Sequence, residues 1–188
     1  MKELHIEGKI NLDELKENKE LVIVRFRDSI ITKEVIEVLN SLNNLKMVVL
    51  EESEITCELD LPNITILSIS ECELNNLDFI SKLTKLESLS IEYMDVDNLN
   101  FINNLNNLNY LSLTGSIIKD KIRLNKTNIE ELHIDGIYYK DLKDIFFPEH
   151  LKVLYISKIQ YLDNAEYYEE MKKYGVEVHF GIDVELFD

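Results

Sequence analysis

The sequence is poor in the residues that cross-link small domains or form tight turns. Its 188 residues include two cysteines, Cys57 and Cys72, two prolines, five glycines and no tryptophan. Two thiols in a chain of this length indicate no disulfide framework, so we expect a reducing, cytoplasmic location. The low glycine and proline content disfavours a β-sandwich, which needs many tight turns. No apolar run approaches the roughly 18 residues of a membrane-spanning helix, and the first residues do not resemble a secretory signal.

Positive charge is scarce as well. Lys and Arg total 20 against 36 Asp and Glu, which gives a formal net charge of −16. Nucleic-acid binding depends on clustered cations that release counterions from phosphates, so this balance argues against a nucleic-acid partner. An anionic membrane surface is disfavoured for the same reason. A basic protein is the partner that the charge favours, because opposite charges steer two molecules toward encounter.

What the sequence does contain is an internal repeat. Pairs of apolar residues separated by one residue recur at intervals of 19 to 24 residues, as in repeat architectures. Within residues 83–105 the apolar spacing changes from two, at Leu89 and Ile91, to three, which indicates a strand followed by a turn of helix. The pairs are Leu4/Ile6, Val24/Phe26, Val48/Leu50, Leu67/Ile69, Leu89/Ile91, Leu111/Leu113, Leu132/Ile134, Leu154/Ile156 and Val178/Phe180.

This pattern resembles the leucine-rich repeat, whose signature is L-x-x-L-x-L-x-x-N/C-x-L with about 20 to 29 residues per repeat. The apolar spacing in residues 83–105 is similar to that of the short bacterial repeats of internalins. The resemblance covers residues 3–182 and implies one domain over residues 1–188. It implies an α/β solenoid, in which a curved parallel sheet of about nine strands is backed by short helices and extended segments.

One position departs from that signature. Family members place a buried Asn or Cys five residues after the first member of each pair, where the Asn bonds the backbone of neighbouring turns. This chain has no Asn at that position. Those backbone groups must be satisfied by Ser, Cys or water, or by a different loop path. The residues found there are Lys9, Ser29, Ser53, Cys72, Met94, Ser116, Ile137, Ile159 and Asp183.

The connections between the apolar pairs predict two kinds of backing for the sheet. Helical spacing occurs in residues 12–18, 33–43, 77–82, 98–104, 141–147 and 165–174. Residues 56–63 contain Pro62, and residues 119–128 are polar without apolar periodicity, so we expect both to be extended.

Side chains alternate faces along a strand, so the residues before, between and after each apolar pair should form three columns pointing away from the core. The central column contains His5, His133 and His179. One alternative is therefore a hydrolase or metal site that uses His133 and His179 with nearby carboxylates. These two histidines lie two strands apart, about 10 Å, with Tyr155 between them. No phosphate-loop, zinc or nucleophile-elbow motif occurs. We expect no catalytic residue, metal or cofactor.

Two groups of outward side chains are the candidate binding residues. Carboxylates follow three successive strands and should gather at one rim, although a solubilising face is the alternative. Tyr110 and Tyr155 flank His133 in the columns, and tyrosine offers large contact area at low entropic cost. The candidate partner-binding residues are Glu51, Glu52, Glu54, Glu71, Glu73, Glu92, Asp95, Tyr110, His133, Asp135 and Tyr155, with Asp97 as the eighth carboxylate of the rim.

Together these features predict a non-enzymatic module that binds a basic protein through its concave sheet and acidic rim. The sharper hypothesis is an intracellular inhibitor, such as an immunity-type protein that blocks a basic toxin or nuclease. The acidic ribonuclease inhibitors of the repeat family provide the analogy. The alternative is a general adaptor or scaffold with no inhibitory role. No small-molecule substrate is indicated.

Overall fold

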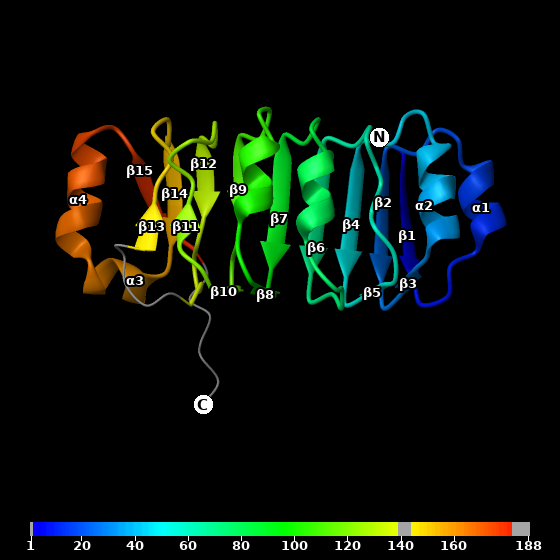
Figure 1. The fold of residues 1–188 in the computed structure, drawn as a ribbon, viewed down its shortest axis with the longest axis horizontal. Coiled ribbons are helices and arrows are strands. Elements are labelled where there is room, and N and C mark those ends of the chain that lie inside the picture. Colours follow the sequence, from blue (N-terminus) through cyan, green and yellow to red (C-terminus); the bar gives the residue numbers. More distant parts are fainter. Residues whose placement is uncertain (1, 139–143, 182–188) are drawn as a thin grey trace.

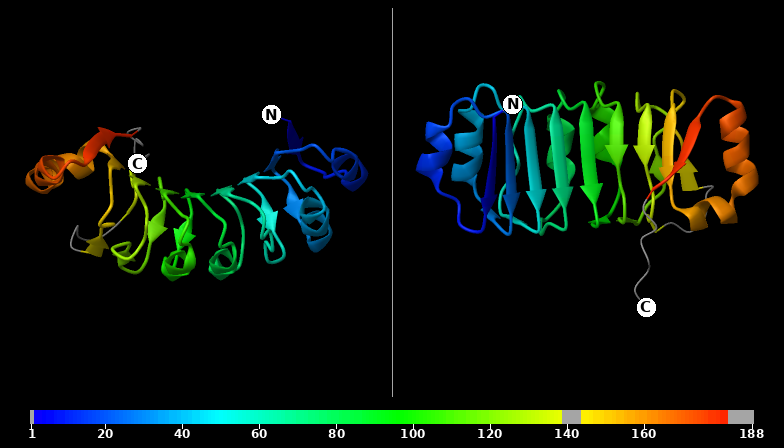
Figure 2. Two further views of the ribbon diagram at one scale, coloured as in Figure 1. Left: turned by 90° about the horizontal axis from the view of Figure 1, so that it is seen from above. Right: turned by 180° about the vertical axis from the view of Figure 1, so that it is seen from behind.

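Nine parallel strands form one sheet that lines the concave side of a curved solenoid (Figures 1 and 2). The computed structural model describes residues 2–138 and 144–181. Each turn adds one strand, in the order β1-β2-β4-β6-β7-β9-β12-β14-β15, which confirms the predicted α/β solenoid. The strands are β1 Glu3–Glu7, β2 Ile23–Arg27, β4 Met47–Glu51, β6 Ile66–Ser70, β7 Ser88–Glu92, β9 Tyr110–Ser112, β12 Glu131–His133, β14 Val153–Ile156 and β15 Glu177–Phe180.

The strands pair without a register shift. The first members of all nine apolar pairs are consecutive partners across the sheet, from Leu4 to Val178. A register shift of one residue would turn the apolar side chains out of the core, so the period-two pattern fixes the register. The columns before and between the pairs are therefore confirmed on all nine strands, and the column after the pairs is in register from Glu7 to Glu92.

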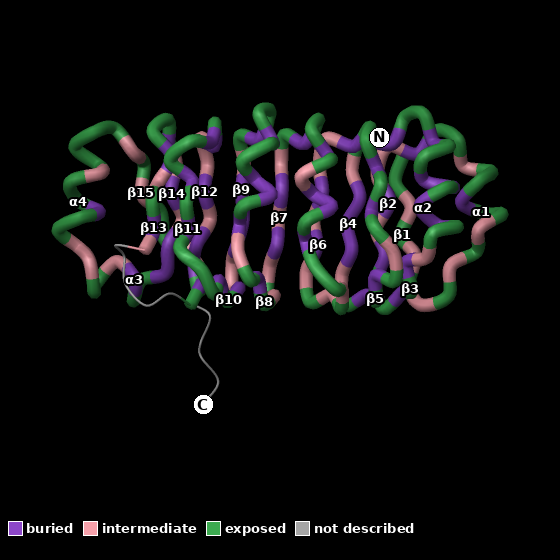
Figure 3. The backbone as a smooth tube through the Cα atoms, in the orientation of Figure 1, coloured by how far each residue is buried: buried purple, intermediate pink, exposed green. Residues whose placement is uncertain are grey.

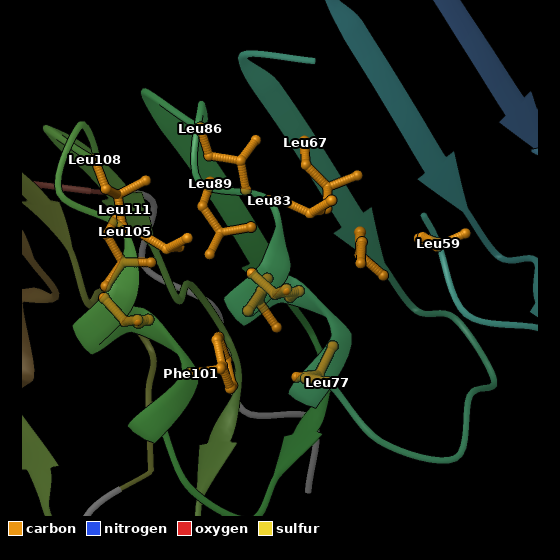
Figure 4. Close-up of a cluster of buried hydrophobic side chains, with 14 of the residues drawn as sticks. Leu59, Leu67, Leu77, Leu83, Leu86, Leu89, Phe101, Leu105, Leu108 and Leu111 are labelled. Carbon is orange, nitrogen blue, oxygen red and sulfur yellow. The ribbon is translucent and has the colours of Figure 1, made fainter. Parts of the chain in front are cut away.

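The core lies between this sheet and the convex segments (Figures 3 and 4). Leu67, Leu89 and Leu111 on adjacent strands have no exposed surface. Leu86 and Leu108 on the segments that lead into β7 and β9 are equally buried. No single turn encloses its own apolar side chains, so each repeat depends on its neighbours for burial.

Helices form on the convex side in five of the six connections predicted to be helical. They are α1 Leu12–Glu17, α2 Lys33–Asn40, the 3₁₀ helices Asp78–Lys82 and Asn100–Asn104, and α4 Ala165–Lys173. Residues 56–63 and 119–128 contain no helix, and the second of these includes β11 Ile122–Arg123, so both extended predictions are confirmed. Within the described residues, no helix has the length and apolar character needed to span a membrane.

The C-terminal turns differ from the sequence prediction in one segment and contain one helix that it did not include. The helix predicted over residues 141–147 is wrong at β13 Ile145–Phe146, which pairs with β11 as an extended convex segment; residues 141–143 lie outside the described residues. In addition, α3 Lys158–Asp163 follows β14 directly. It begins with a capping box, in which the side chain of Ser157 accepts from Gln160 N and the side chain of Gln160 accepts from Ser157 N.

Serine takes the place of the missing Asn. Ser29 and Ser53 are buried, and Ser53 Oγ accepts from Ser29 N at 3.1 Å and donates to Glu51 O at 2.7 Å. In a later turn the buried Ser116 Oγ accepts from Met94 N and donates to Ile91 O, both at 3.1 Å. One hydroxyl thus bridges two turns, and the predicted use of Ser at this position is confirmed.

Candidate functional site

The predicted carboxylates follow the strands at one edge of the sheet, the lower edge in Figure 1. After β4 and β6 the chain turns through Glu52 and Glu71, whose φ angles of 48° and 53° are left-handed. The turn then sends the chain into the convex side, where β5 Glu54–Ile55 exposes Glu54 and buries Ile55. The rim carboxylates Glu52, Glu54, Glu71, Glu73, Asp95 and Asp97 are exposed, whereas Glu51 and Glu92 are partly exposed.

Five carboxylates from three successive turns line one hollow of about 340 Å³. We call this the acidic hollow; its carboxylates are Asp28, Glu52, Glu54, Glu71 and Glu73. Arg27 forms an ion pair with Glu52. Within the described residues, Glu54, Glu71 and Glu73 have no ion pair with Lys or Arg. The hollow therefore concentrates negative charge that the chain itself leaves largely uncompensated.

The same edge is apolar in the later turns. Asp95 of β8 Asp95–Val96 pairs with Ile117 of β10 Ile117–Ile118, and Ile117 pairs with Tyr138. Ile117 and Tyr138 are 44% and 68% exposed, and Tyr93 is 46% exposed. Sequence reasoning missed this part of the rim. The signal was available, because Ile117 and Tyr138 occupy the repeat position that holds Glu54, Glu73 and Asp95 in earlier turns.

On the concave face, four aromatic side chains from the last four strands contact one another in sequence; the Tyr110–His133 pair is tilted and the other two pairs are stacked. Ring centroids of Tyr110 and His133 are 5.0 Å apart, those of His133 and Tyr155 are 4.1 Å apart, and those of Tyr155 and His179 are 5.0 Å apart. We call these four residues the aromatic ladder. The columns place them on adjacent strands, so the predicted cluster of Tyr110, His133 and Tyr155 is present and extends to His179.

Carboxylates surround the Tyr110 end of the ladder. Glu131 Oε1 lies 2.9 Å from His133 Nε2. Ser112 Oγ donates to Glu92 Oε1 at 2.5 Å. Burial, together with the negative charges of Glu92 and Glu131, raises the pKa of Tyr110, because each of them disfavours the phenolate. The phenol is held in a negative field on the concave surface.

One candidate residue is not where we expected it. Asp135 is 4% exposed and accepts from Thr114 Oγ1 at 3.1 Å, so the expectation that its side chain faces solvent is wrong. The last turn covers this carboxylate, since Gly181 lies against it so closely that an added Cβ would meet Asp135 Cγ at 2.5 Å. Asp135 contributes charge to this region without presenting its carboxylate to the surface.

Comparison with known proteins identifies the architecture. No family model matches the sequence, and no curated protein matches it. An internalin (inlF) from Listeria monocytogenes is similar in structure, with a TM-score of 0.54 and 20% identity over 78% of this chain and 51% of that chain. Internalin C2 (inlC2) from the same species has a TM-score of 0.52 and 20% identity over 92% and 84% of the two chains. The chain has the leucine-rich repeat fold. It spans about half the length of the first internalin chain.

In this leucine-rich repeat the two histidines of the hydrolase or metal alternative do not form a joint site. His133 and His179 each stack on Tyr155, from opposite sides of it in the strand order. Each histidine lies beside a glutamate two residues earlier in its own strand, at 2.9 Å for Glu131 and 3.5 Å for Glu177. No group of three or more His, Cys, Asp or Glu among the described residues could hold a metal ion.

Proposed function

We propose that this leucine-rich repeat protein is a non-enzymatic binding module for a basic protein, which it contacts through the acidic hollow and the concave sheet. The acidic hollow is the observation that carries the proposal. Five carboxylates converge there from three turns, and one arginine pairs with one of them. Like charges held together repel, so a partner that supplies Lys or Arg relieves this repulsion when it binds.

The partner's approach depends on charge, and the final fit depends on the concave face. The net charge of −16 speeds the encounter with a cationic surface and orients it toward the region of greatest negative potential. The aromatic ladder on the concave face then becomes buried against the partner. Tyr is enriched where binding energy is concentrated. The rim therefore affects the association rate more than the concave face does.

We further propose that binding inhibits the partner, as an immunity-type protein blocks a toxin or nuclease, and that this happens in the cytoplasm. An enzyme that acts on a polyanion exposes a cationic surface. A rim of carboxylates is complementary to that surface and covers it when bound. An adaptor that binds a basic protein without inhibiting it is the alternative outcome of the test.

The test compares two variants that have the same net charge. The rim variant replaces Glu54, Glu71 and Glu73 by Lys. The control replaces Glu20, Glu87 and Glu149 by Lys; these exposed carboxylates precede β2, β7 and β14 at the opposite edge of the sheet. Wild type and both variants serve as bait in extracts of the native host, at low and high salt.

We expect wild type and the control to retain one stoichiometric basic protein that high salt releases, and the rim variant to lose it. An activity assay of the captured protein, with and without this chain, separates an inhibitor from an adaptor. Equal retention by the rim variant and the control contradicts the role of the acidic hollow.

A further inference from the structure

The aromatic ladder has two unlike ends. His133 and Tyr155 each have a ring neighbour on both sides along the sheet. Tyr110 has only one ring neighbour among the described residues, His133, because its in-register partner on β7 is Ser88. Beside Ser88 on the same face lies Ser90, again a small side chain. The side of Tyr110 toward β7 is therefore not stacked against another ring.

The Tyr110 end is also the more negative part of the ladder. Burial raises the pKa of Tyr110 most, and the charges of Glu92, Glu131 and Asp135 raise it further. Ser112 and Thr114 connect Glu92 to Asp135 by hydrogen bonds of 2.5 Å, 3.1 Å and 3.1 Å. Within the described residues, neither Lys nor Arg forms an ion pair with these three carboxylates, and His133 is the basic partner of Glu131. One Glu131 oxygen and one Glu92 oxygen bond within the protein, which leaves the other oxygen of each as an acceptor.

The aromatic face and the carboxylates at this end favour some ligand groups over others. A guanidinium is planar, stacks on an aromatic face and donates in two directions to carboxylates. An ammonium is compact and strongly hydrated, so it gains less from a ring face at a partly open site. Phosphate-bearing ligands are repelled by the three carboxylates, which excludes base stacking by a nucleic acid.

We propose that the Tyr110 end of the aromatic ladder, with Glu92 and Glu131, binds one arginine side chain of the partner. The guanidinium lies against the β7 side of Tyr110, over Ser88, where its N–H groups donate to the free oxygen of Glu92, while Glu131 on the β12 side of the ring adds negative charge. This inference rests on the proposed function, since it names the residue type that the basic partner inserts. The acidic hollow steers the partner, and the Tyr110 end gives it specificity.

The probe is a capped peptide, acetyl-Gly-Ser-Arg-Ser-Gly-amide, titrated into the full chain and followed by NMR of the Tyr110 and His133 ring protons. Two matched peptides replace the arginine by citrulline, which is nearly isosteric and neutral, or by lysine. We expect saturable shifts of both rings with the arginine peptide and a dissociation constant on the order of millimolar, as for a single side chain. Lysine should bind about three to ten times more weakly, and citrulline should cause no saturable shift.

Variants assign the effect to individual groups. Tyr110→Leu and Glu92→Gln should each weaken arginine-peptide binding by about tenfold. Glu92→Gln keeps an oxygen that accepts from Ser112, and Tyr110→Phe keeps the ring and should bind within about twofold of wild type. Tyr174→Leu is the control, because Tyr174 is 81% exposed at the end of α4. Equal binding of the citrulline and arginine peptides, or unchanged affinity in Tyr110→Leu and Glu92→Gln, overturns the inference.

The rim variant distinguishes this inference from the proposed function. It leaves the Tyr110 end intact, so in 0.15 M salt, where screening acts over about 8 Å, it should retain the arginine-peptide shifts while it loses the basic partner. An arginine peptide that leaves the Tyr110 and His133 ring protons unshifted refutes the arginine site and leaves the proposed function standing. Partner retention by the rim variant refutes the proposed function without touching the peptide result.

Discussion

The first four turns and the last four turns share one interior and differ in what they expose. Leu67 in the fourth turn and Leu132 in the seventh are both fully buried at the same repeat position. Outside, the early turns present the carboxylates of the acidic hollow, whereas the later turns present Ile117 and Tyr138 on the same edge and the aromatic ladder on the concave face. All nine tyrosines lie at or after Tyr93.

This contrast shows that the repeat keeps its interior uniform while its surface chemistry changes along the chain. Inward residues are constrained by stacking with the neighbouring turns, so they stay nearly uniform. Outward columns carry no such constraint, and each region can acquire its own chemistry. Substitutions inside the solenoid should therefore have similar effects in the early and late turns, whereas substitutions outside should have different ones.

Truncation of the shared core should affect both regions alike. Leu67→Ala and Leu132→Ala should each lower the free energy of unfolding by about 2–5 kcal/mol, because each leaves a cavity at a fully buried position. Denaturant titration followed by far-ultraviolet circular dichroism measures the change. Leu162→Ala is the control, since Leu162 is 65% exposed, and should cost less than about 0.5 kcal/mol. A cost below about 1 kcal/mol in one region alone would show that the interiors are not equivalent.

Loss of the bridging serines should have a smaller effect, again similar in the two regions. Ser53→Ala and Ser116→Ala each remove a buried hydroxyl that accepts from an N–H of the preceding turn and donates to a backbone carbonyl. We expect a loss of about 1–3 kcal/mol in each, because the N–H of Ser29 or of Met94 loses its acceptor. Ser41→Ala, at the exposed end of α2, is the control for the same denaturation experiment. Neutral effects at both buried positions would contradict the bridging role.

The left-handed turns at Gly8 and Gly115 should distinguish the early turns from the later ones. Gly8 has a φ of 71°, and a Cβ added there would meet no atom within 4 Å, whereas a Cβ on Gly115, at φ 67°, would meet the Tyr93 ring at 2.5 Å. Gly8→Ala should cost about 1 kcal/mol through its backbone alone, and Gly115→Ala should cost more. In the Tyr93→Ala background the excess at Gly115 should disappear. An equal cost of both substitutions in wild type would mean that the Tyr93 ring moves aside freely.

Alkaline pH should affect the later turns. The pKa values of Tyr110, Tyr161 and Tyr167 are raised, by burial first for Tyr110 and Tyr167 and by the hydrogen bond to Glu169 first for Tyr161. A raised folded-state pKa contributes stability that is complete below the unfolded value, near pH 10, and is lost as pH rises above it. Unfolding free energies between pH 8 and 11 should fall less steeply in Tyr110→Phe than in Tyr174→Phe. Identical slopes would show that Tyr110 does not contribute.

Most of the fold follows from the sequence because stacking strands demand a strict apolar period. The nine apolar pairs predict the strands and their register, and the columns place Tyr110, His133 and Tyr155 side by side. The convex side is less predictable, because either a helix or an extended segment such as β13 can cover the core there. The capping box at Ser157 and Gln160 was a readable signal for α3. Burial of Asp135 depends on the close approach of Gly181 in the last turn, which period-two spacing does not specify.

The association rate with the purified basic partner decides whether the acidic hollow directs recognition. At low salt the rim variant, with Lys at 54, 71 and 73, should associate about 10 to 100 times more slowly than wild type, and the difference should shrink at high salt. The opposite-edge control, with Lys at 20, 87 and 149, should remain within about threefold of wild type, since its substitutions lie away from the hollow although the two variants have equal net charge. Equal rates for the two variants would contradict the claim that the acidic hollow directs recognition.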